Sequence, residues 1–116
     1  MRILALSLAA LSLLILAHPD KAVAEEPNCM IVLYSRVNFE PGHRGGFRII
    51  FTDVADLRNQ DFDGWAYSFV IVRGRWTFFK NRNISQQLGQ ELGPGLYSSV
   101  KSAGIDHPMS SMRCRP

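Results

Sequence analysis

Short apolar segments alternate with turn-forming residues from residue 30 to the C-terminus. The apolar segments are rich in β-branched and aromatic residues, which favour strands, and glycine-rich turns separate them. No long segment has helical periodicity, although 54–57 and 98–103 could each form one helical turn. This pattern predicts a single all-β domain, an antiparallel sandwich with Greek-key connections. The predicted strands are 30–34, 47–51, 68–72, 75–79, 96–100 and 111–114.

Two parts of the chain repeat one pattern. Residues 34–39 begin a segment that ends at 63–68, and residues 79–84 begin a second that ends at 106–111. The beginnings are 79 − 34 = 45 residues apart and the ends are 106 − 63 = 43 apart. A nearly constant offset indicates a duplicated supersecondary unit. Each copy is too short to bury its apolar face alone, so we expect the two copies to share one core.

The N-terminal residues have the order of a secretory signal peptide. Arg2 precedes an uncharged apolar run, residues 3–17, and residues 22–24 provide an A-x-A cleavage site. The alternative is an uncleaved membrane anchor, but the run is shorter than the roughly 20 residues of a spanning helix. We expect cleavage after Ala24, which leaves one domain, residues 25–116, in a secreted or periplasmic protein that is not integral to a membrane.

The two cysteines stand near opposite ends of that domain. Cys29 follows the predicted cleavage site closely, and Cys114 is the third residue from the C-terminus. In an oxidising compartment this placement indicates a disulfide that joins the first strand to the last. The alternative is two free thiols. A zinc site is not expected, because two cysteines and two remote histidines lack ligand spacing.

Charge and motifs argue against an enzyme. The formal net charge is +3, and a basic surface could attract acidic glycans, anionic lipid or nucleic acid. Solvated arginines on strand edges explain the same residues, and no nucleic-acid partner is expected. No nucleophile elbow or H-E-x-x-H motif is present, and His43 and His107 are the only histidines after the cleavage site. The acidic cluster Asp53, Asp56, Asp61 and Asp63 could suggest paired carboxylates, but it is interpreted as a solvated acidic loop.

Residues 29–114 resemble a single βγ-crystallin domain made of two Greek-key motifs. Each motif of that family begins with aromatic-x4-aromatic-x-Gly and ends near (Asn/Asp)-(Asn/Asp)-x-x-(Ser/Thr)-Ser. Tyr34 and Phe39 match the first opening, with the glycine displaced by one position. Phe79 matches the second, whereas Ile84 replaces the second aromatic residue and Gln86 the glycine. The resemblance implies an all-β, two-motif Greek-key β-sandwich.

The resemblance also implies paired calcium sites at the two closing segments, because calcium prefers six to eight oxygen ligands. Both segments depart from the pattern, with Gly64 and Tyr67 in the first and His107 in the second. We therefore expect at most weak calcium binding. The alternative is that Asp63, Ser68, Asp106 and Ser111 only close turns through hydrogen bonds to the backbone. The candidate ligands are Asp63, Ser68, Asp106 and Ser110.

The predicted function is that of a secreted, non-enzymatic binding or structural module with at most weak calcium binding, and with an extracellular protein or glycan as its unidentified partner. The same fold also occurs in exported protease inhibitors and toxin-like proteins, whose activity would lie in a loop such as 53–64 or 81–95. A stress or envelope protein without a specific ligand is a third interpretation. Phe78 and Phe79 should point to opposite faces, so one of them marks a partner surface unless a hairpin covers it.

Overall fold

The computed structural model describes residues 26–42 and 46–116, which form strands and two short 3-10 helices. The predicted signal peptide, residues 1–24, lies outside the described residues. No helix in the described ranges is long and apolar enough to cross a bilayer. In chain order the elements are β1 (Met30–Tyr34), η1 (Val37–Phe39), β2 (Phe47–Ile50), η2 (Leu57–Gln60), β3 (Ser68–Arg73), β4 (Arg75–Asn81), β5 (Ser85–Leu92), β6 (Gly95–Tyr97) and β7 (Ser111–Arg115).

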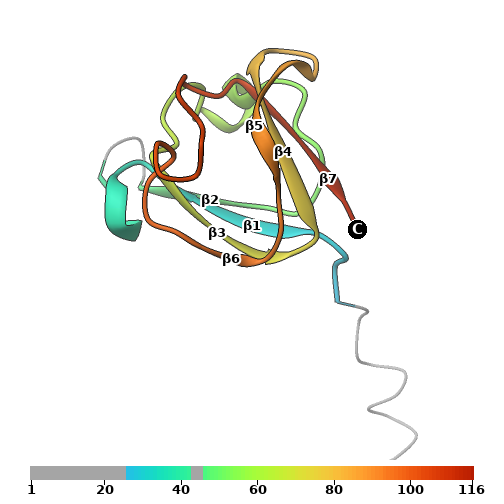
Figure 1. Ribbon diagram of the computed structural model, residues 1–116, viewed down its shortest axis with the longest axis horizontal. Coiled ribbons are helices and arrows are strands. Elements are labelled where there is room, and N and C mark those ends of the chain that lie inside the picture. The colour runs from blue at the N-terminus through green and yellow to red at the C-terminus, as the bar shows by residue number, and fades with distance from the viewer. Residues whose placement is uncertain (1–25, 43–45) are drawn as a thin grey trace, which may run out of the picture.

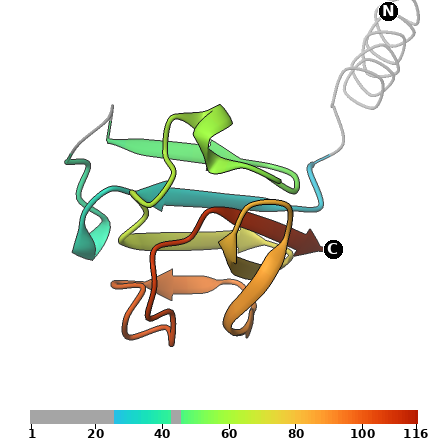
Figure 2. The same cartoon turned by 90° about the horizontal axis from the view of Figure 1, so that it is seen from above.

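The strands form two antiparallel sheets that pack face to face (Figure 1). The first sheet has the order β2-β1-β3-β6, and its strands lie side by side from the green β2 to the orange β6 in Figure 2. The second sheet has the order β5-β4-β7. This arrangement confirms the predicted all-β, two-sheet fold.

Each motif lends one element to the sheet of the other. The first motif supplies β1, β2 and β3 to the first sheet, and β6 of the second motif completes that sheet by pairing with β3. In the opposite direction, Val54 of the first motif forms an isolated bridge with Met112 of β7. Because β6 and Val54 each pair with the sheet of the other motif, each motif is a Greek key and the two motifs share one core.

The core lies between the two sheets. Ile31, Leu33 and Phe69 point inward from the first sheet, and Trp76 and Phe78 point inward from the second; all five are fully buried. The rings of Phe69 and Phe78 meet across the core with centroids 4.9 Å apart. Burying side chains of this size contributes about 1.5–3 kcal/mol each, so this layer is the main source of stability.

Two sequence-based assignments were wrong in detail. Residues 81–95, proposed as an exposed functional loop, contain β5, because the segment pairs along β4 from Asn81 to Trp76. The predicted strand at 96–100 is shorter, since β6 ends at Tyr97 and the backbone then turns. Segment 53–64 does connect strands, but Val54, Leu57 and Phe62 are buried in it, so it packs against the domain rather than protruding.

Candidate functional site

Ser68 holds the first folded hairpin against the sheet. Its buried hydroxyl donates a 2.5 Å hydrogen bond to the Arg36 carbonyl and accepts a 3.0 Å bond from the Phe39 amide. Between these partners the chain bends through Asn38 and Phe39, both left-handed at φ of 58° and 60°. Residues with a Cβ rarely adopt this conformation, so it requires support from outside the hairpin. Ser68 gives that support.

Ser111 does the same for the second hairpin. Its hydroxyl donates to the Asn81 carbonyl at 2.6 Å and accepts from the Ile84 amide at 3.0 Å. Asn83 and Ile84 are again left-handed, at φ of 61° and 56°. Every partner of Ser111 in these bonds lies 45 residues after the matching partner of Ser68. The two serines therefore occupy equivalent positions, and both act as the turn-closing alternative describes.

Asp63 and Ser110 come together at a pocket of about 430 Å3, which we call the polar pocket. Its remaining lining residues are consecutive members of the second hairpin. The polar pocket is lined by Asp63, Lys80, Asn81, Arg82, Asn83 and Ser110. Two of the four candidate ligands, one from each closing segment, thus meet at one place, as paired motifs require.

Asp106 lies at the equivalent position of the other motif, but its neighbouring residues differ from those of Asp63. It lines a pocket of about 460 Å3, the apolar pocket, together with Val37, Tyr67, Val100 and Ile105. Val37 stands where Arg82 stands in the repeat, and Tyr67 stands where Ser110 stands. The bulky ring of Tyr67 thus replaces the compact hydroxyl of Ser110, a ligand type that a hard cation favours, whereas Val37 replaces an arginine, which offers no oxygen. Ser68, the fourth candidate ligand, lines neither pocket, because its hydroxyl is buried beneath the first folded hairpin, where it bonds to Arg36 and Phe39.

The Asp63 carboxylate has an unusual environment. Its Oδ1 is buried and has no hydrogen-bond partner among the described residues. A buried carboxylate oxygen is costly when unpaired, so such an atom calls for a water or an ion as its partner. Within the described residues, no group of three or more His, Cys, Asp or Glu side chains could hold a metal. Any cation at Asp63 must therefore take most of its ligands from hydroxyl, amide and backbone oxygens and from water.

Two other acidic residues of segment 53–64 have structural partners. Asp53 accepts a 2.8 Å hydrogen bond from the backbone amide of Cys114. Asp56 accepts from the Arg58 amide at 3.0 Å and pairs with the Arg58 guanidinium at 2.8 Å. These side-chain bonds to Arg58 lower the pKa of Asp56 below its ordinary value. Neither carboxylate lines the polar pocket.

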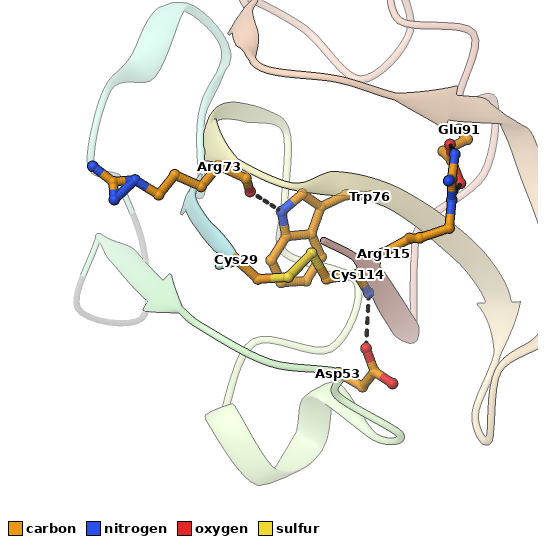
Figure 3. Close-up of a disulfide and its surroundings, with 7 residues drawn as sticks. All are labelled: Cys29, Asp53, Arg73, Trp76, Glu91, Cys114 and Arg115. Atoms are coloured by element: carbon orange, nitrogen blue, oxygen red, sulfur yellow. Dashed lines mark hydrogen bonds and ion pairs between the residues drawn. A yellow bond between two sulfur atoms is a disulfide. The ribbon is translucent and has the colours of Figure 1, made fainter. Parts of the chain in front are cut away.

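The Cys29–Cys114 disulfide joins the start of β1 to β7, with the Cα atoms 6.3 Å apart (Figure 3). It lies beside Trp76, which pairs with Cys114 in the sheet and donates from its indole to the Arg73 carbonyl at 3.0 Å. Gly74, in the β3–β4 turn, has a φ of +83°, and a Cβ there would collide with the Sγ of Cys114. Position 74 therefore requires glycine for two reasons: the backbone has a positive φ there, and the Sγ of Cys114 occupies the space that a Cβ would need.

Beyond the disulfide, the second sheet carries an ion-pair cluster on its surface. Glu91 of β5 is paired with Arg75 of β4 at 2.7 Å and with Arg115 of β7 at 2.6 Å. Hydrogen bonds from Arg115 and then Arg75 lower the pKa of Glu91 to about 2. The cluster links all three strands of this sheet across its outer face.

Phe78 and Phe79 do point to opposite faces, but neither is exposed. Phe78 lies in the core, and Phe79, on the outer face, is only 5% exposed. The guanidinium of Arg113 lies 5.5 Å from the centroid of the Phe79 ring, at a cation–π distance. Phe79 is thus covered and does not mark a partner surface.

Comparison with solved structures identifies the fold. No family model matches the chain, and no curated protein matches it either. A βγ-crystallin from an archaeon is 29% identical over 75% of this chain and 98% of its own, with a TM-score of 0.64. The βγ-crystallin of Ciona intestinalis is 26% identical over 74% of this chain and 99% of its own, with a TM-score of 0.65.

The chain has the βγ-crystallin fold. A third structure with this fold, a transition-metal-ion-binding βγ-crystallin from Methanosaeta thermophila, is 28% identical over 73% of this chain and 99% of its own, at a TM-score of 0.60. The resemblance inferred from the opening and closing motifs is confirmed at the level of the fold. The polar pocket is the part of this βγ-crystallin fold that retains candidate metal ligands from both motifs.

Proposed function

We propose that the mature chain is an exported, non-enzymatic binding domain that takes up one calcium ion weakly at the polar pocket. The observation that carries this proposal is the buried Oδ1 of Asp63, which has no hydrogen-bond partner in the described part of the chain and belongs to a residue that lines the same pocket as Ser110. A divalent cation would supply the missing partner. The terminal disulfide supports export, because such bonds persist in oxidising compartments.

The donor atoms of the polar pocket favour calcium over a transition metal. Asp63, Ser110, Asn81 and Asn83 offer oxygen ligands, and no histidine or cysteine lines this pocket. Calcium takes oxygen ligands at flexible geometry, whereas transition metals favour imidazole and thiolate. Metal binding by the Methanosaeta thermophila protein supports a metal role for the fold, but not the identity of the metal here.

The same lining explains why binding should be weak. Lys80 and Arg82 share the polar pocket with a single carboxylate, and their charges oppose the entry of another cation. Calcium affinity falls with fewer charged ligands, toward dissociation constants of about 10⁻⁴–10⁻³ M in extracellular modules. Calcium at millimolar concentration outside cells would still occupy such a site. The apolar pocket, with Tyr67 in place of the Ser110 hydroxyl and apolar side chains such as Val37 and Val100 beside Asp106, is proposed to bind none.

Thermal unfolding in calcium and in chelator tests this proposal. With a dissociation constant of about 1 mM, 10 mM calcium should stabilise the native state by about 1.4 kcal/mol. For a domain of this size that corresponds to a rise in Tm of about 6–11 °C. Asp63→Asn should abolish the rise, and the matched variant Asp106→Asn should retain it. Identical melting curves for the unmutated protein in both conditions would contradict calcium binding.

The inhibitor or toxin-like alternative gains no support from the two segments suggested for it. Segment 81–95 is largely strand β5, and segment 53–64 is tied down at Val54 and Leu57 by backbone bonds to Met112 and Ser110. Inhibitory loops are commonly exposed and project toward a partner. A panel of serine and metalloproteases assayed with the purified domain would test the alternative directly, and stoichiometric inhibition would revive it.

A further inference from the structure

The outer face of the first sheet is apolar. Along β1, β2 and β3, alternate residues point into the core, and the intervening ones point outward, as strand geometry requires. On this face the large apolar side chains are 41–74% exposed, and several more are half-buried between them. We call this surface the outer apolar face. Its exposed members are Phe47, Ile49, Phe51, Val72 and Leu96, and its half-buried members are Met30, Val32, Tyr34 and Val70.

The strand register makes these residues one continuous surface. Ile49 pairs with Val32, Val32 pairs with Val70, and Val70 pairs with Leu96. This row therefore crosses all four strands without interruption. Phe47, paired with Tyr34, lies at one end of the face, with ring centroids 6.3 Å apart. None of the nine members is charged.

The second sheet shows what a solvated outer face looks like in this domain. Its surface carries the Glu91 cluster with Arg75 and Arg115, and Arg113 covers Phe79. An antiparallel sheet with one face in water normally alternates between apolar and polar residues. The run Met30–Tyr34 does not alternate, because both its inward and its outward residues are apolar. Such a pattern is typical of a sheet that is covered on both faces.

We infer that the outer apolar face is a dimer interface that binds the same face of a second copy of this chain. A standard interface buries about 800 Å2 per partner, of which about 450–520 Å2 is apolar. The five exposed side chains have areas of about 150–200 Å2 each and leave about half of this uncovered, which gives about 400–500 Å2. The half-buried members add to this, so the face has the apolar area that one protomer of a standard dimer needs.

The row that crosses the four strands, Ile49, Val32, Val70 and Leu96, contains no charged residue, which argues for a second copy as the occupant. In a two-fold dimer each face meets its own copy, so any charged residue near the axis would oppose its counterpart. A neutral face avoids that repulsion. Two sheets packed face to face are also a stable layer arrangement, with about 10 Å between them. The dimer would thus bury the first sheet on both sides and leave both charged second sheets in solvent.

The test is the mass of the oxidised mature domain by sedimentation equilibrium from about 1 µM to 1 mM. The unmutated protein should reach twice the monomer mass within this range. Leu96→Lys, at the most exposed position of the face, should raise the dissociation constant at least about tenfold. Ile49→Lys, at the opposite end of the same row, should do the same. Gln87→Lys, an exposed position on the second sheet, is the matched control and should leave the dimer intact.

Several outcomes would overturn the inference. A protein that stays monomeric at 1 mM, or a Leu96→Lys variant that dimerises like the unmutated protein, would each contradict it. Near-UV circular dichroism of every variant guards against misfolding, and Leu96 is exposed enough to tolerate a lysine. A monomer that sediments with phosphatidylcholine–phosphatidylserine vesicles, and loses this with Leu96→Lys, would assign the face to lipid instead.

Discussion

Replacing Ser68 by alanine should destabilise the domain even when no calcium is present. The substitution removes one hydroxyl and leaves the Arg36 carbonyl and the Phe39 amide without their partner. A hydrogen bond contributes about 1 ± 0.5 kcal/mol net, and a buried group left unsatisfied costs about 1–3 kcal/mol. The expected loss is therefore about 2–4 kcal/mol. For a domain of this size this lowers the Tm by roughly 8–30 °C.

Urea unfolding in chelator measures this loss, with an unchanged dependence on urea as the sign that only stability has changed. Ser111→Ala should cost a similar amount, because its hydroxyl makes the equivalent two bonds to Asn81 and Ile84. The control is Ser102→Ala, whose exposed hydroxyl forms hydrogen bonds with the nearby Ser99, and which should change stability by less than about 0.5 kcal/mol. A loss at Ser68 no larger than this control would refute the reasoning, and a loss seen only in calcium would make Ser68 a ligand instead.

Three more predictions concern the disulfide and the surface of the second sheet. Reduction of the Cys29–Cys114 bond, which spans 85 residues, should lower the free energy of unfolding by about 4–5 kcal/mol, measured by urea unfolding with and without reductant. Gly74→Ala should destabilise the oxidised protein more than the reduced one, because its Cβ meets the Sγ of Cys114; equal losses in both states would count against that contact. NMR titration should find Glu91 with a pKa of about 2, since the two arginines favour its charged form. That stabilisation is complete above pH 4.5 and is lost as the pH falls toward 2, so Glu91→Gln should flatten the pH dependence of stability in this range.

The strands that the sequence predicted are those whose inward residues are large and apolar. β1, β3 and β4 combine β-branched and aromatic residues with clear turns at their ends, so local composition was enough to find them. β5 was missed because Ser85–Leu92 consists mainly of glutamine, glycine and leucine, and it has left-handed residues at Gln86 and Gly89. Its strand conformation comes from pairing with β4, which is a non-local effect that local propensity does not report.

The candidate site was predicted in its composition but not in its arrangement. The closing segments drew attention to Asp63 and Ser110, which line one pocket, and the repeat implied that residues from both motifs would meet. The sequence did not distinguish a serine that lines a pocket, Ser110, from one that is buried beneath a folded hairpin, Ser68, because local composition does not report which side chain a hairpin will cover. The outer apolar face was also missed, because a run of apolar residues does not say which face is in water.

The exchange of elements between the two motifs has a consequence for how such a domain could arise. A polypeptide with one motif alone would lack the element that fills the edge of its sheet, since β6 and Val54 each complete the sheet of the other motif. Two copies of such a polypeptide could complete each other only by associating. Joining the copies through the short turn at Gly74 makes that association intramolecular. The pairing of the two motifs then no longer depends on the protein concentration. Cutting the chain at Gly74 and reducing the Cys29–Cys114 disulfide should therefore give two fragments that fold only on mixing, as an ancestral single-motif pair would have done.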